Sequence, residues 1–178
     1  MTRIRIALLI AALVAVALPA AADAKQRTRT FSSGPLGTPL GDNAAGASRI
    51  LLPKGRIKDV DVRVRLSHGN DGDVDLSLLP PAGVPLVLST DNGGGGNGYG
   101  AGTNDCNGSF TVFDDVAPVV ITAAAPPFAG FFRPEQPLGA LVGQQMRGPW
   151  WFLFTDDAGG NSGILGCWEL EVTYKLPK

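Results

Sequence analysis

The last part of the chain reads GPWWFLFTDD over residues 148–157 and GILGCWELEV over residues 163–172. The first stretch is an apolar run, the second alternates apolar and polar residues, and a short polar segment separates them. All three tryptophans lie in these two stretches, with one of the two cysteines. Since a period of two places every second side chain on one face, we predict a closing pair of β-strands on which the rest of the domain packs.

Upstream strands repeat this alternation. Residues 57–67 read IKDVDVRVRLS, which puts valines and leucine on one face and Arg63 and Arg65 on the other, where we expect them to be solvated. Residues 73–78 alternate again, and residues 84–88 follow after a proline-rich turn. We predict that the three segments form a β-meander.

The whole composition favours an all-β domain. The 24 glycines and 14 prolines separate short apolar runs, and no long helical pattern occurs. We predict a single β-sandwich domain of about eight or nine strands over residues 48–175, including one strand at 119–122. Residues 25–47 are expected to be a flexible lead-in with a possible edge strand at its start, and residues 138–143 one helical turn or a bend.

Residues 1–24 have the organisation of a secretory signal peptide: a basic start, an apolar run and an Ala-x-Ala cleavage pattern. The apolar run is too short for a membrane span, which needs roughly 20 residues. No other stretch is long and apolar enough, so no stable membrane span is expected after cleavage. We expect a secreted, periplasmic or cell-envelope protein, and its formal net charge of −1 gives no general attraction to nucleic acid.

Charge is unevenly distributed along the sequence. Residues 25–65 hold nine Lys and Arg, whereas residues 66–132 hold none but carry seven aspartates. Carboxylates without basic partners repel one another unless they are spread apart or neutralised, and oxygen ligands suit calcium. The spacing D-x-D-x-D at 71–75 is not an EF-hand. A calcium site is one interpretation and solvated loop acids are the other; the candidate ligands are Asp73, Asp75, Asp91, Asp114 and Asp115.

The residue types and motifs in the sequence argue against a catalytic function. His68 is the only histidine, neither G-x-S-x-G nor H-E-x-x-H occurs, and we expect His68 to be a structural or surface residue. Carboxylate pairs for glycoside hydrolysis exist, but Asp pairs after strands fit turns better. Cys106 and Cys167 are an even pair, which in an exported protein suggests one disulfide, with two free thiols as the alternative.

Residues 90–108 form a long glycine-rich loop, which is either functional or held in place by something. Its GxGxxG spacing is not a dinucleotide motif, since no helix pattern follows. Alternation places Trp168 in the core, and it places Trp150 and Trp151 on opposite faces of their strand. We expect the loop to cover the outward-facing tryptophan. Tyr99 and Trp151 are the candidates for a partner surface.

From residue 50 onward the chain resembles the P domain, also called the P/Homo B domain, of proprotein convertases such as kexin and furin and of many bacterial secreted proteases. The resemblance rests on residues 59–83, with a histidine, a Gly-Asp before an apolar strand and a proline-glycine turn. It rests also on the Phe-Asp-Asp at 113–115 and on the Gly-x-Trp and Trp-x-Leu of the closing stretches. It covers about residues 48–174 and implies a jelly-roll-like β-sandwich.

In that family the module follows a subtilisin-like catalytic domain and stabilises it without cutting peptide bonds. After the signal peptide about 150 residues remain, which leaves no room for such a catalytic domain. The resemblance therefore implies a non-catalytic module with a protein partner, for example a secreted subtilisin-like protease. The alternative is a calcium-dependent carbohydrate-binding or adhesion module, because jelly rolls host many lectins.

Overall fold

The computed structural model describes residues 25–176, so the predicted signal peptide lies outside the described residues. Within this range the chain forms ten strands and three short 3₁₀ turns and no α-helix. The elements are β1 (Gln26–Ser32), β2 (Thr38–Leu40), β3 (Ala45–Leu52), β4 (Arg56–His68), η1 (Asp71–Asp73), β5 (Val74–Leu79), β6 (Leu86–Ser89), β7 (Thr111–Phe113), η2 (Ile121–Ala123), β8 (Gly130–Phe132), η3 (Leu138–Leu141), β9 (Gly148–Asp156) and β10 (Gly163–Lys175).

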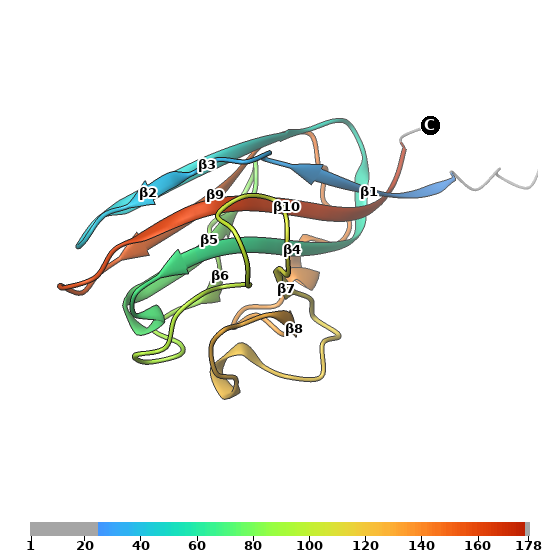
Figure 1. Ribbon diagram of the computed structural model, residues 1–178. Helices are drawn as coiled ribbons and strands as arrows, with labels where there is room; N and C mark the ends of the chain where they lie inside the picture. The colour runs from blue at the N-terminus through green and yellow to red at the C-terminus, as the bar shows by residue number, and fades with distance from the viewer. Residues whose placement is uncertain (1–24, 177–178) are drawn as a thin grey trace, which may run out of the picture.

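The strands make two sheets that pack face to face as a β-sandwich (Figure 1). The first sheet has the order β1-β10-β4-β7-β8, with β2 also paired to β10. The second sheet has the order β3-β9-β5-β6. The pairings are antiparallel except that of β7 with β8, which is parallel. The predicted all-β single domain is confirmed.

The closing strands β9 and β10 both exist, but they do not pair with each other. β9 lies between β3 and β5 in the second sheet, and β10 lies between β1 and β4 in the first. Residues 157–162 carry the chain from one sheet to the other. The prediction of a closing strand pair was wrong in this respect, because alternation shows which face of a strand is buried and not which strand lies beside it.

The predicted meander was wrong for the same reason. β5 and β6 are neighbours, with Leu78 opposite Leu86, but β4 belongs to the other sheet. Residues 119–122 also differ from the prediction, since they form the 3₁₀ turn η2 and a single bridge from Val120 to Arg133. Residues 25–47 are more ordered than expected: β1 is an edge strand as predicted, and β2 and the start of β3 follow it.

One continuous core fills the space between the sheets. The alternating residues of β4, β5, β9 and β10 point into it as predicted. Trp168 of β10 lies beside Phe152 of β9, with ring centroids 5.5 Å apart, and its indole N–H donates to the Ser48 hydroxyl of β3 at 2.9 Å. Trp168 therefore connects the two sheets and satisfies its polar group inside the core.

Candidate functional site

The two cysteines form a disulfide, as the prediction from an even pair suggested. Cys106 lies in the loop before β7 and Cys167 lies in β10, with a sequence separation of 61 residues. The bond holds residues 100–109 against the outer face of the first sheet. Gly166 allows this approach, since a β-carbon there would lie 2.6 Å from the Asn104 carbonyl carbon.

The glycine-rich loop is held along its whole length by hydrogen bonds. Backbone amides of Asp71 and Gly72 donate to the carbonyl oxygens of Gly96 and Gly94, at 2.8 and 3.0 Å. Tyr99 and Leu66 exchange two backbone bonds, and the Tyr99 hydroxyl lies 2.9 Å from the Ser89 hydroxyl. Tyr99 is consequently 1% exposed, and its prediction as a surface residue was wrong.

Trp151 lies on the outer face of the second sheet and is half-buried. The guanidinium of Arg49, on the neighbouring strand β3, lies 5.5 Å from the centre of its ring. The glycine-rich loop is tethered instead to the first sheet, so the expectation that it covers this tryptophan was wrong.

Of the two arginines expected on a solvated face, only one is in water. Arg63 is about one-third exposed and lies 3.3 Å from Glu169. Arg65, two residues along the same strand, is 3% exposed beneath the disulfide-linked loop. A β-carbon on Gly108 would lie 2.6 Å from the Arg65 Nη1, so only glycine lets the loop pass so closely.

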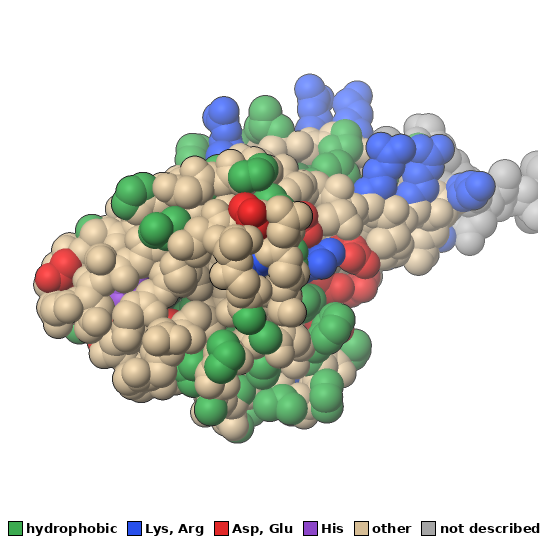
Figure 2. Space-filling view, in the orientation of Figure 1, with side chains coloured by type: hydrophobic (Ala, Val, Ile, Leu, Met, Phe, Trp, Pro, Cys, Tyr) green, Lys and Arg blue, Asp and Glu red, His purple; other side chains and the backbone are tan. Residues whose placement is uncertain are grey.

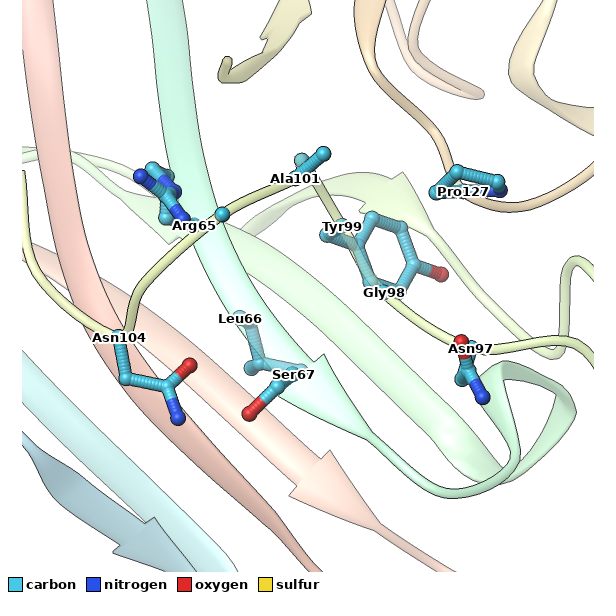
Figure 3. Close-up of a pocket in the computed structure, with 11 residues that line it drawn as sticks. Arg65, Leu66, Ser67, Asn97, Gly98, Tyr99, Ala101, Asn104 and Pro127 are labelled. Atoms are coloured by element: carbon cyan, nitrogen blue, oxygen red, sulfur yellow. The ribbon is translucent and has the colours of Figure 1, made fainter. Parts of the chain in front are cut away.

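A pocket lies beside Arg65, between the end of β4 and residues 97–104 (Figure 3). Its volume is about 250 Å³. Ser67, Asn97 and Asn104 contribute polar groups to its wall, and buried Tyr99 forms part of its floor. A second hollow of about 370 Å³ shares Ser67, Asn97 and Gly98 with the pocket and extends it toward Ser162.

His68 is structural, as expected. It is 4% exposed, its Nδ1 lies 2.7 Å from the Asn70 carbonyl oxygen, and its Nε2 lies 3.0 Å from Asp156 Oδ2. Both ring nitrogens therefore have partners within the fold. Asp156 was expected only to lead into a turn, and its role as the buried partner of His68 has no signal in the local sequence.

The structure divides the five proposed calcium ligands into two groups. The first group lies around β5 and the end of β6 and consists of Asp73, Asp75 and Asp91. Burial, followed by the charges of Asp157 and Glu135, raises the pKa of Asp91. Burial, followed by Asp91, raises the pKa of Asp75, and Asp75 Oδ1 has no hydrogen-bond partner within the described chain.

Asp114 and Asp115 lie elsewhere, after β7. Asp115 accepts the backbone amides of Leu138 and Gly139, and Asp114 accepts that of Val116. These are the turn-stabilising bonds that short acidic side chains often make. Between residues 25 and 176, the one group of three metal-type side chains that approach one another is Cys106, Cys167 and Glu169, whose sulfurs are already in the disulfide.

An apolar surface lies at the other edge of the first sheet, around β8. Phe131 is 60% exposed and Val116 is 86% exposed. Val119 follows on a segment joined to the end of β8 by a 2.7 Å bond from the Arg133 amide to the Val119 carbonyl. Figure 2 shows hydrophobic side chains gathered over this lower part of the molecule, where Figure 1 places β7 and β8. Phe131, Val116 and Val119 are called the β8 surface below.

One solved structure reaches a similarity that supports the fold class, and two others are less similar. Over 84% of this chain, the serine protease of Aeromonas sobria superposes with a TM-score of 0.50 and 15% identity, and the match covers 27% of that protein. The complex of the same protease with the chaperone ORF2 gives a TM-score of 0.49 at 16% identity, covering 86% of this chain and 27% of that one. FlhE gives 0.48 at 9% identity, over 85% of this chain and 99% of FlhE.

The chain thus spans about a quarter of the length of the Aeromonas protease that it matches. No curated protein matches the sequence. No helix in the described part of the chain is long and apolar enough to cross a membrane.

The family model of the proprotein convertase P-domain matches residues 57–172, from the start of β4 to near the end of β10. This range includes His68 with its partner Asp156, the glycine-rich loop and both cysteines. The match covers well over half of the chain and includes the inner strands of both sheets. The chain belongs to the proprotein convertase P-domain family.

Proposed function

We propose that this protein is an exported, non-catalytic P domain that binds and stabilises the catalytic domain of a subtilisin-like serine protease. The observation that carries the proposal is the family match over residues 57–172, which spans the core of the sandwich. Membership of a protease-associated family makes a protease the expected partner, and the apolar β8 surface offers a place for it to bind.

The surroundings of the only histidine support a non-catalytic role. A triad needs a histidine nitrogen free to take a proton from a nucleophile. In this chain both nitrogens of His68 are engaged, by Asn70 and Asp156, and the side chain is enclosed. His68 would have to leave the fold to act as a general base.

The β8 surface is the proposed docking site. β8 is the terminal strand of its sheet, and exposed apolar side chains beside such an edge are unfavourable in water unless a partner covers them. A hollow of about 330 Å³ next to it is lined by Phe110, Val112 and Phe131, with Arg63 at its rim. An apolar anchor of the catalytic domain would fit this combination of edge and hollow.

Calorimetric titration tests the docking site. The protein is titrated into the catalytic domain of a convertase-type serine protease that was produced without its own P domain. Phe131→Asp is expected to weaken binding at least about tenfold, because it places a charge in an apolar interface. Val84→Asp is the matched control, since Val84 is 74% exposed in the turn between β5 and β6. Equal affinities for both variants, or no binding by the wild type, would contradict the proposed surface.

The carbohydrate alternative finds less support. Of its two aromatic candidates, Tyr99 is buried and Trp151 lies against Arg49. A glycan array with and without calcium tests it, and no binding in either condition would remove it.

A further inference from the structure

Arg65 is a buried charge whose one carboxylate partner among the described residues, Asp105, is distant and partly exposed. Its side chain is 4% exposed, and Nη2 donates to the Thr103 carbonyl oxygen. Nε and Nη1 have no hydrogen-bond partner within the described chain. The carboxylate oxygen next to it, Asp105 Oδ1, lies 3.9 Å from Nη1 and already accepts from the Thr103 hydroxyl and the Asn107 amide. A buried guanidinium normally has closer and better-aligned acceptors than these.

The adjoining pocket is open to solvent, and its wall mixes polar and apolar groups without a carboxylate, although the Asp71 carboxylate behind it accepts the Gly98 amide. Its polar wall residues are Ser67, Asn97 and Asn104, which offer hydroxyl and amide donors (Figure 3). The hollow that continues it adds Ser162 and likewise contains no acidic side chain. Because low-dielectric surroundings screen a charge poorly, the field of Arg65 reaches into this pocket.

We propose that the pocket between β4 and residues 97–104 binds the carboxylate of a peptide. Arg65 lies behind the loop, so it attracts the carboxylate through its field, while Asn97, Asn104 and Ser67 make the direct hydrogen bonds. The continuing hollow accommodates the peptide groups next to the carboxylate. The volume suits the end or one side chain of a peptide rather than a large ligand.

Two observations favour a peptide over an acidic sugar. The one aromatic residue in the pocket wall, Tyr99, is 1% exposed, which leaves no ring face for a sugar to stack on. Asparagine side chains carry one donor and one acceptor group each, which matches the peptide bond. The pocket lies on the same edge of β4 as β7 and β8, but it shares no residue with the β8 surface, and the inference does not depend on protease binding.

An NMR titration tests the pocket with four probes: acetyl-Ala-Ala with a free carboxylate, its carboxamide, acetyl-Glu-Ala carboxamide, and glucuronate. We expect at least one carboxylate peptide to shift the side-chain amide signals of Asn97 and Asn104, with an affinity at least about tenfold above that of the uncharged carboxamide. A response to the free chain end identifies a terminal carboxylate as the ligand, and a response to the glutamate peptide identifies an acidic side chain.

Substitutions at Arg65 and at control positions distinguish an effect of the Arg65 charge on binding from an effect on folding. Arg65→Met is expected to abolish the preference for carboxylate and Arg65→Lys to retain most of it, since lysine keeps the charge. Arg63→Met is the matched control on the same strand and is expected to bind like the wild type. If Arg65→Met does not fold, Asn104→Ala, an exposed position, is expected to weaken binding at least about threefold through one lost hydrogen bond.

Three results would overturn the inference. The first is equal binding of the carboxylate and carboxamide peptides, or binding of neither. The second is binding that Arg65→Met, or Asn104→Ala in its place, leaves unchanged. The third is a response to glucuronate without any response to the peptides. Loss of protease binding through Phe131→Asp would leave all of these measurements unaffected, so the two proposals fail separately.

Discussion

At the scale of single residues, His68 and Asp156 form a hydrogen-bonded pair in which both side chains are fully buried, unlike the Arg–carboxylate pairs in the described part of the chain. The pair joins the end of β4, in the first sheet, to the end of β9, in the second. Removing one member of a buried pair leaves the other desolvated and unpaired. The His68–Asp156 pair therefore holds the two sheets together at this end of the sandwich.

Asp156→Asn is predicted to lower the free energy of unfolding by about 1.5–3 kcal/mol, the usual contribution of a buried hydrogen bond to a charged group. Chemical denaturation at neutral pH measures this. Glu169→Gln is the control, because its pair with Arg63 is partly exposed and is worth at most about 1 kcal/mol. Similar losses in both variants would show that the burial of the His68 pair has no special energetic role.

The raised pKa of Asp61 predicts how the free energy of unfolding changes with pH. Burial, followed by the charges of Asp114, Asp59 and Glu171, raises the pKa of Asp61 from its ordinary value to about 7. The folded state thus holds this proton where the unfolded state has lost it. Its stabilising contribution is full at low pH and is lost as the pH rises through about 7.

We therefore expect the unfolding free energy to fall between pH 5 and pH 8, and Asp61→Asn to make this fall shallower because asparagine has no proton to lose. Burial also raises the pKa of Asp71, to about 6, which adds to the slope in both proteins. Denaturation curves at several pH values give the comparison. An unchanged slope in the variant would show that Asp61 does not contribute.

Calcium binding stays a prediction, and we test it at Asp91, which lies near Asp75 and Asp73. A weak site of the extracellular kind should raise the melting temperature by about 3 °C or more in 10 mM calcium. Asp91→Asn should remove most of this rise and should itself be tolerated, because position 91 has a left-handed backbone (φ of 52°) that asparagine adopts readily. Identical melting temperatures in calcium and in chelator would exclude the site.

At the scale of elements, the disulfide loop is the least predictable part of the structure. The sequence indicated that Cys106 and Cys167 pair and that the loop needs an anchor. It did not indicate that the loop would cover Arg65, because burial of that side chain comes from a contact between segments far apart in the chain. A second long-range contact, between Tyr99 and Leu66, places Tyr99 in the core, where we expected a surface residue.

Loss of the disulfide is predicted to lower the unfolding free energy by about 4 kcal/mol in the chain-entropy model, given a loop of 61 residues. The comparison is between oxidised wild type, reduced wild type and the double variant Cys106→Ala with Cys167→Ala, by denaturation. The reduced and double-variant proteins should agree closely. If reductant further destabilises the double variant, the loss of stability on reduction has a cause other than the disulfide.

Individual strands were easier to predict than their partners. In β4, β5, β9 and β10 the inward residues follow directly from alternation, which depends only on the geometry of a single strand. The sheet to which each strand belongs depends on connections that leave no period in the sequence. Thus Trp168 was correctly expected in the core, while β9 and β10 were wrongly expected to pair.

At the scale of the whole molecule, the two candidate surfaces lie on the same side of β4 in the first sheet but are made of different residues. The β8 surface is apolar and lies at the free edge, whereas the Arg65 pocket is polar and lies beneath the disulfide loop. The second sheet presents Trp151 with Arg49. A protease at the β8 surface and a peptide carboxylate in the Arg65 pocket would therefore be held on the same side of β4.

The thermal inactivation of a convertase-type catalytic domain, produced without its own P domain, tests the proposed function most directly. The residual peptidase activity is followed at a fixed temperature with and without a saturating amount of this protein. We predict that the wild type and Val84→Asp lengthen the half-life at least about threefold, that Phe131→Asp does not, and that the protein alone cleaves no substrate. An unchanged half-life with the wild type, or peptidase activity in the pure protein that is lost on His68→Ala, would contradict the proposal.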